Sequence, residues 1–234
     1  HLDDAAVDEL DGADIDAAGL SALHPDVDAR QVDITDDDAL TRLVDGIVDA
    51  HGRLDIVVNL AATYLDEGAD TSRADWLRAL DVNLVSAVRV VAIARPHLAA
   101  HGNGAVINIT SISSSVAQTG RWVYPVSKAA LVQLTRSQAM DLAGDGIRVN
   151  GVNPDGVVRG SGIFAGGWGA QRAAVYGVKE DDLGAFYANR TLLKREVLPE
   201  HVANAVFVLC SSDLSHTTGL HIPVDAGVAA AFLR

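Results

Sequence analysis

The sequence has a single cysteine and few basic residues. Because Cys210 is alone among 234 residues, no internal disulfide can form, and its apolar surroundings indicate a small buried side chain. Lysine and arginine number 18 against 31 aspartates and glutamates, which gives a net charge of −13. A protein with this charge repels nucleic acid and anionic membrane surfaces, so we expect neither as a partner.

Long apolar runs are also absent. No segment reaches the ~18–20 apolar residues of a membrane-spanning helix, because Asn83, Arg89 and Arg95 interrupt the most apolar helical pattern. No secretory signal is visible, so we expect a cytoplasmic protein. With 49% hydrophobic residues, the chain is long enough for one sizeable core, and we expect a single domain over residues 1–234.

A third absence concerns a connection near the N-terminus. Residues 5–7 resemble the start of a buried strand and residues 13–16 the end of another, yet only six residues separate Val7 from Asp14. Two parallel strands need a crossover of a dozen or more residues, usually a helix. We therefore expect that a strand–loop–helix piece is missing between residues 7 and 14; a truncated or degenerate chain is the alternative.

The rest of the sequence alternates short apolar runs with helical patterns, which predicts an α/β fold with a parallel sheet. We expect strands at 30–34, 54–59, 104–111, 146–153 and 219–224, and helices at 36–52, 75–100, from 124 and from 199. Thr35 is the expected N-cap of the first helix. The glycine- and aromatic-rich segment from 160 to about 189 is predicted to form a substrate lid, or else an irregular surface insertion.

The chemistry-bearing residues lie in the middle of the chain. Tyr124 and Lys128 are four positions apart in a helical pattern, so they share one face. A cation beside a phenol lowers its pKa and suits it to proton exchange. Ser111 ends an apolar strand, at the edge where ligands bind in open α/β sheets. Asn83 is a polar residue inside a helical pattern and is costly to bury without hydrogen bonds.

Asn83, Ser111, Tyr124 and Lys128 match, in order and spacing, the Asn-Ser-Tyr-Lys tetrad of the short-chain dehydrogenase/reductase family. The likeness runs from about Asp14 to the C-terminus. It implies a Rossmann-type doubly wound sheet with helices on both faces and an NAD(P)-dependent interconversion of a secondary alcohol and a ketone. Tyr124 would exchange the substrate proton, Lys128 bind the nicotinamide ribose, Ser111 hold the substrate oxygen and Asn83 position a relay water.

The resemblance also implies a cofactor site. Asp14, at a strand end, would hold the adenosine ribose and favour NAD(H) over NADP(H); Asp16 is a neighbouring candidate, and a helix-capping acid is the alternative. Adenine would pack on Asp33 and Ile34. The further cofactor-binding candidates, besides Tyr124 and Lys128, are Asn59, Ala61, Pro154, Asp155 and Val157.

Four features depart from the family pattern. The glycine-rich phosphate loop, T-G-x-x-x-G-x-G, is absent, and a chain without it would bind no dinucleotide. Ala62 and Asp155 replace glycines, and Arg159 replaces a threonine beside the nicotinamide. We expect Arg159 to recognise an anionic or polyhydroxylated substrate or to pair with Asp155, with an exposed loop arginine as the alternative. Other candidate substrate contacts are Ser113, Gln118 and Trp122.

Two segments, 152–163 and 190–194, resemble more narrowly the dehydrogenase half of bifunctional rhamnulose-phosphate aldolase/lactaldehyde dehydrogenases. The alternatives are a 3-oxoacyl-[acyl-carrier-protein] reductase, whose acidic partner the charge of −13 would repel, and a catalytically silent binding or scaffold relative.

We expect a small-molecule substrate and, from the apolar tail 228–233, a homodimer or homotetramer. His97 and His101 have the i,i+4 spacing of a zinc pair, but a helix end explains both and we expect no metal.

Overall fold

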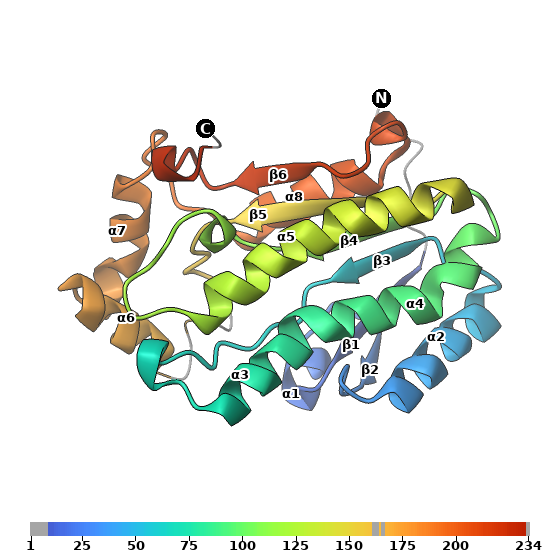
Figure 1. Cartoon of the computed structure of the whole chain (residues 1–234), viewed down its shortest axis with the longest axis horizontal. Coiled ribbons are helices and arrows are strands. Elements are labelled where there is room, and N and C mark those ends of the chain that lie inside the picture. The colour runs from blue at the N-terminus through green and yellow to red at the C-terminus, as the bar shows by residue number, and fades with distance from the viewer. Residues whose placement is uncertain (1–8, 161–163, 165–166, 233–234) are drawn as a thin grey trace.

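The computed structural model describes residues 9–160, 164 and 167–232 of the chain, in which strands alternate with helices (Figure 1). None of the described helices is long and apolar enough to cross a membrane. The strands are β1 (Leu10–Asp14), β2 (Val27–Gln31), β3 (Ile56–Asn59), β4 (Ala105–Ile109), β5 (Arg148–Pro154) and β6 (His221–Val224). The helices are α1 (Ala17–Ser21), α2 (Asp37–His51), α3 (Arg73–Leu80), α4 (Ser86–Ala99), α5 (Val123–Leu142), α6 (Trp168–Tyr176), α7 (Leu183–Asn189) and α8 (Pro199–Cys210).

Every strand pair is parallel, as the apolar runs predicted. The strands form a four-stranded sheet in the order β3-β4-β5-β6 and a separate β1-β2 pair. Helices α4 and α5 cover one face and α8 the other (Figure 1). The predicted α/β fold, with a parallel sheet flanked by helices in one domain, is confirmed.

The sheet is divided between β1 and β3. A cavity of about 1370 Å³ separates these strands and continues to the carboxyl ends of β4 and β5. Leu10 and Asp11 line it from the β1 side, and Ile56 and Val58 from the β3 side. Leu10 and Val58 are 55% and 42% exposed, although side chains inside parallel sheets are ordinarily buried. Among the described residues no strand lies between β1 and β3, so the edges of both strands face this cavity.

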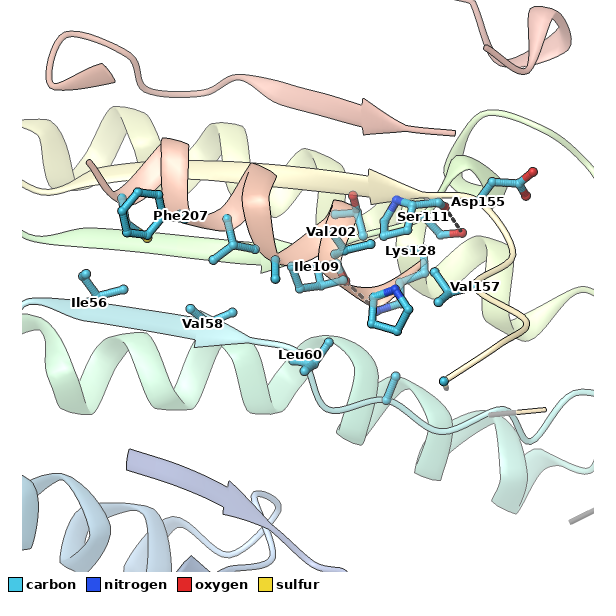
Figure 2. A pocket seen from close by; sticks show the side chains of 18 of the residues that line it. Ile56, Val58, Leu60, Ile109, Ser111, Lys128, Asp155, Val157, Val202 and Phe207 are labelled. Atoms are coloured by element: carbon cyan, nitrogen blue, oxygen red, sulfur yellow. Dashed lines mark hydrogen bonds between the residues drawn. The ribbon is translucent and has the colours of Figure 1, made fainter. Parts of the chain in front are cut away.

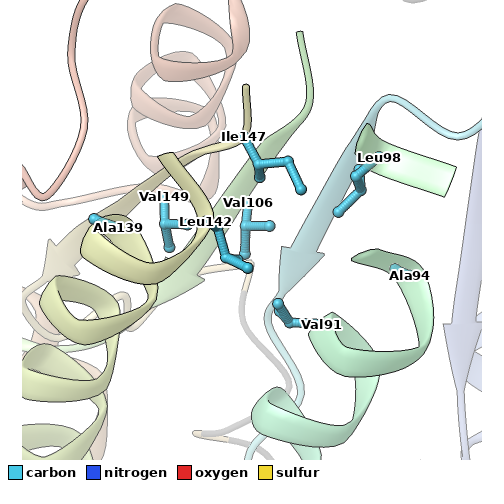
Figure 3. Close-up of a cluster of buried hydrophobic side chains, with 8 residues drawn as sticks. All are labelled: Val91, Ala94, Leu98, Val106, Ala139, Leu142, Ile147 and Val149. Atoms are coloured by element: carbon cyan, nitrogen blue, oxygen red, sulfur yellow. The ribbon is translucent and has the colours of Figure 1, made fainter. Parts of the chain in front are cut away.

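The main core lies between the four-stranded sheet and helices α4 and α5 (Figure 3). All five residues of β4 are buried, because this central strand has a neighbour on each side and helices on both faces. The cluster consists of Val91, Ala94, Leu98, Val106, Ala139, Leu142, Ile147 and Val149. This packing fixes α5, which carries two of the predicted catalytic residues, against the strand that leads to Ser111.

Two boundaries near the first long helix differ from prediction. The strand expected at 30–34 lies at 27–31, because Asp33 accepts hydrogen bonds from the backbone and hydroxyl of Thr35 and turns the chain. Asp36, not Thr35, is the N-cap of α2, accepting from the N–H groups of Asp38 and Ala39. The predicted stop at Gly52 is confirmed by its positive φ of 75°.

The helix predicted over 75–100 is interrupted. A π-helical turn, Asp81–Val85, separates α3 from α4 and contains Asn83. Such turns insert one residue into an α-helix and occur often at functional sites. The periodicity of the sequence predicted the helices and did not reveal this turn.

The segment predicted as a lid contains α6 and α7, so most of it is not irregular. Tyr187 packs with Ala173 and Leu183 in a small core of its own. Residues 161–163 and 165–166 lie outside the described residues, as does the strand proposed at 5–7. Because β1 runs without a break from Leu10 to Asp14, the expected missing piece would precede Leu10.

Candidate active site

Tyr124 and Lys128 lie in the first turns of α5 and both line the cavity, which confirms that they share a helix face. Pro125 is accommodated in the first turn, where its missing N–H has no helical partner. The Lys128 Nζ donates to the carbonyl of Ile109 at 2.7 Å (Figure 2). The same Nζ lies 5.8 Å from the centroid of the Tyr124 ring. Lys128 is only 2% exposed, so its charge is buried.

Ser111 follows β4 at the carboxyl end of the sheet, as predicted. Its Oγ accepts from the N–H of Ser113 at 3.1 Å, and the Ser111 hydroxyl is near enough to the Tyr124 phenol to lower the pKa of that phenol. Ser111, Tyr124 and Lys128 therefore converge on one end of the cavity. The candidate substrate residues Ser113 and Gln118 also line it, whereas Trp122 is not among the lining residues.

Asn83 connects the π-turn to two other elements. Its Oδ1 accepts from the N–H of Thr63 at 2.7 Å, and its Nδ2 donates to the Thr63 carbonyl and the Ser127 Oγ. These bonds satisfy a side chain that is 2% exposed, which meets the cost of burying an amide inside a helix. Asn83 does not line the cavity, so its side chain holds α5 and the loop after β3 in place.

The expected lowering of the Tyr124 pKa is not found. Burial raises the pKa of Tyr124 well above its ordinary value and the neighbouring Tyr64 adds to the rise. The Ser111 hydrogen bond and the charge of Arg121 oppose the rise without overcoming it. Lys128 does not produce the lowering, and burial lowers the pKa of Lys128 itself to about 8. The sequence spacing correctly predicted that Tyr124 and Lys128 are neighbours, but it contains no information on how far burial removes the phenol from water.

Asp66, in the loop after β3, is a site residue that the sequence analysis missed. Helix α5 begins without a local side-chain cap, and Asp66 instead accepts hydrogen bonds from the N–H groups of Trp122 and Tyr124 at 2.9 and 2.8 Å. It also accepts from the N–H of Gly68 and pairs with Arg121. Burial raises the pKa of Asp66, but these hydrogen bonds and the Arg121 charge outweigh burial and leave the pKa below its ordinary value.

Three further side chains form a wall beside the phenol. The rings of Tyr64 and Tyr124 have centroids 5.0 Å apart, and Trp168 of α6 lies 5.9 Å from Tyr64. The Arg121 guanidinium lies 5.1 Å from the Tyr124 ring and 5.0 Å from the Trp168 ring. These residues come from three separate segments, so no local spacing could have identified them as a group.

The anionic and cationic residues after β5 pair differently from the prediction. Asp155 pairs with Arg190, and burial raises the pKa of Asp155 although Arg190 opposes the rise. Arg159 pairs instead with Glu196 at 2.7 Å, and its side chain is 69% exposed. The expected Arg159–Asp155 pair is therefore wrong, and Arg159 is not among the residues that line the cavity.

The predicted cofactor residues divide into two sets. Pro154, Asp155 and Val157 line the cavity together with Tyr124 and Lys128, so this end fits a nicotinamide ribose. The others do not line the cavity. Asp14 accepts a hydrogen bond from the N–H of Asp16, Asp33 accepts from Thr35, and Asn59 donates to Asn108. Ile34 follows Asp33 in the sequence, and Ala61 lies two positions after Asn59. Asp16 is the N-cap of α1.

A dinucleotide also needs a cradle for its phosphates. Among the residues that line the cavity, Gly156 and Gly160 are the glycines, and both follow β5. The described part of the chain thus supplies the catalytic end of such a site and no glycine-rich phosphate turn. In that same part of the chain, no group of three or more histidine, cysteine or acidic residues is arranged to hold a metal ion.

Comparisons with known proteins agree with this geometry. A family model described as "Enoyl-(Acyl carrier protein) reductase" matches residues 12–229. The uncharacterized oxidoreductase YuxG of Bacillus subtilis is 35% identical over 209 residues, 88% of this chain and 30% of YuxG. A 2-keto-3-deoxy-L-fuconate dehydrogenase of Xanthomonas campestris is 31% identical over 92% of this chain and 69% of its own length. The cis-4-hydroxycyclohexanecarboxylate dehydrogenase of Sinomonas cyclohexanicum is 32% identical over 95% and 85%.

A solved structure has the same architecture. The aldohexose dehydrogenase of Thermoplasma acidophilum, in ligand-free form, superposes with a TM-score of 0.81 at 25% sequence identity. The superposition covers 94% of this chain and 84% of that one.

Proposed function

Because this chain belongs to the short-chain dehydrogenase/reductase family, we propose that it interconverts a secondary alcohol and a ketone with NAD(P) as the redox partner. The observation that supports this proposal is the convergence of Ser111, Tyr124 and Lys128 at the carboxyl end of β4, on the wall of one large cavity. When bound, the nicotinamide cofactor supplies the hydride chemistry.

The protein's own groups act on the proton and the oxygen of the substrate. Tyr124 exchanges the proton of the substrate hydroxyl, and Ser111 donates a hydrogen bond to the oxygen on which charge develops. Lys128 would hold the cofactor ribose, and a cation beside the Tyr124 ring favours the phenolate form during proton exchange. Asn83 keeps α5 in position, and a relay water near the π-turn would connect Lys128 to solvent.

The substrate class that we propose is a polyol, a sugar or a hydroxy acid. Relatives at about 30% identity act, by their names, on 2-keto-3-deoxy-L-fuconate, meso-2,3-butanediol and cis-4-hydroxycyclohexanecarboxylate. The resemblance of segments 152–163 and 190–194 to the dehydrogenase half of bifunctional rhamnulose-phosphate aldolase/lactaldehyde dehydrogenases is a second reason for proposing this substrate class. A 29% identical 3-oxoacyl-[acyl-carrier-protein] reductase of Thermotoga maritima supports the second candidate function.

For the cofactor we propose NAD(H), because the family resemblance assigns the adenosine ribose to an acid at the end of this strand, where Asp14 ends β1, and a carboxylate repels a ribose phosphate. The cavity between β1 and β3 has the position of one further parallel strand, so we place the expected strand–loop–helix piece and its phosphate turn there. The proposed oligomer is a homodimer or homotetramer.

The test is a panel of hydroxy acids, sugars, diols and a 3-oxoacyl thioester, each assayed with NAD(H) and NADP(H) by absorbance of the reduced cofactor. Turnover of an alcohol or ketone supports the proposal, and reduction of the thioester alone supports the second candidate. No turnover of any compound by a protein shown to bind cofactor would leave the scaffold alternative.

A further inference from the structure

Arg121 is a nearly buried cation beside the phenol of Tyr124. It is 6% exposed, lines the cavity, and precedes α5 by two residues. Burying a guanidinium costs free energy unless its N–H groups donate hydrogen bonds. The acceptors of those N–H groups therefore indicate the role of the residue.

The protein uses one edge of this guanidinium. The Arg121 Nε donates to Asp66 at 3.2 Å, and the two terminal nitrogens make no hydrogen bond to any residue in the described ranges. Asp66 receives three backbone N–H groups as well, so its charge is shared among four donors. The pair therefore holds the guanidinium fixed and leaves several donors for another acceptor.

These remaining donors lie beside the ring of the proposed acid/base residue, Tyr124. The guanidinium carbon lies 5.1 Å from the centroid of the Tyr124 ring and 5.0 Å from that of the Trp168 ring. Lys128, the other cation at this end of the cavity, is committed to the Ile109 carbonyl. Arg190 is committed to Asp155 and Arg159 to Glu196.

We propose that the terminal nitrogens of Arg121 bind a carboxylate of the substrate, so that the enzyme acts on hydroxy and oxo acids in preference to neutral polyols. A guanidinium binds a planar carboxylate through two parallel hydrogen bonds. The chain carries a net charge of −13 and repels anions at long range, so an acidic substrate needs a local cation. This proposal rests on the proposed oxidoreductase function and narrows its substrate class.

The test compares each hydroxy acid of the panel with its carboxamide and with the matching phosphate ester, using the full chain. For wild type, kcat/KM for the acid exceeds that for the amide. Arg121→Gln lowers kcat/KM for the acid about 10- to 100-fold, as expected for a lost charged hydrogen bond, and changes the amide value by less than about 3-fold. Arg121→Lys restores part of the preference, because it keeps the charge and loses the fork.

Controls separate binding from structure. Arg136→Gln removes an exposed arginine of α5, the helix that follows Arg121, and leaves kcat/KM for both substrates unchanged. If Arg121→Gln fails to fold, the double variant Asp66→Asn/Arg121→Gln removes the buried charge and the comparison is repeated. An equal loss of kcat/KM for acid and amide overturns the proposal and leaves Arg121 as a structural partner of Asp66. A higher kcat/KM for the phosphate ester than for the acid also overturns the carboxylate proposal, in favour of a phosphate group.

Calorimetric titration of the same compounds distinguishes failure of this proposal from failure of the proposed function. If wild type binds the acid, Arg121→Gln binds it about 10-fold or more weakly and neither protein turns over any compound, the carboxylate site is supported and the oxidoreductase function is refuted. If the protein oxidises neutral diols and shows no preference for acids, the oxidoreductase function is supported and the carboxylate site is refuted.

Discussion

Replacing Lys128 with methionine should stabilise the protein at neutral pH while it abolishes activity. Burial lowers the lysine pKa from 10.5 to about 8. That difference corresponds to about 3 kcal/mol of unfavourable charge burial, at about 1.4 kcal/mol for each tenfold change. Methionine has a similar length and no charge, but it loses the hydrogen bond to the Ile109 carbonyl, which costs about 1–3 kcal/mol. The net expectation at pH 7 is a gain of about 1 kcal/mol in the free energy of unfolding.

The dependence on pH identifies the cause. Because the folded-state pKa lies below the unfolded one, the charge penalty is fully present below about pH 8 and disappears as the pH rises toward 10.5. Between pH 7 and 9.5 wild type should therefore gain about 2 kcal/mol relative to Lys128→Met. All other groups titrate alike in both proteins, so their effects cancel in the difference.

Urea denaturation of both proteins at the two pH values measures this difference. Lys179→Met, which removes an exposed lysine, is the matched control and should show no such dependence. A difference between wild type and Lys128→Met that stays constant with pH would refute the argument, because the lysine would then be charged and well solvated in the folded protein.

Three other expectations follow from the same site. Tyr124→Phe should leave the thermal midpoint nearly unchanged and remove nearly all turnover; a rate above a tenth of wild type would exclude Tyr124 as the acid/base group. Asp66→Asn should lower stability by about 1–3 kcal/mol and slow turnover by loosening the start of α5. Since the pKa of Asp66 lies below 3.8, the stability difference should be full at neutral pH and shrink as the pH falls below that value; an unchanged difference at pH 3 would contradict it. Intact mass spectrometry should give about 2–3 kDa more than 24.5 kDa, the size of one strand–loop–helix piece, and 24.5 kDa itself would rule out that piece.

The sequence predicted the parts of the site that depend on local spacing. Tyr124 and Lys128 share a face because any helix brings i and i+4 together, and Ser111 meets them because an apolar parallel strand ends at the ligand edge. Asp66 was not predictable in this way, since it reaches the N–H of Tyr124 across 58 positions. The raised tyrosine pKa depends on burial by the whole fold, which no motif records.

The divided sheet gives the two halves of the molecule different rigidity. The β1-β2 ladder shares no hydrogen bond with the four-stranded ladder, and its residues are largely exposed or half-buried, whereas β4 is wholly buried. Segments with few buried contacts open at lower free energy than the core. Among the described residues the β1-β2 pair therefore opens at lower free energy than the ladder that leads to Ser111, and a strand placed between β1 and β3 would join both ladders into one rigid sheet.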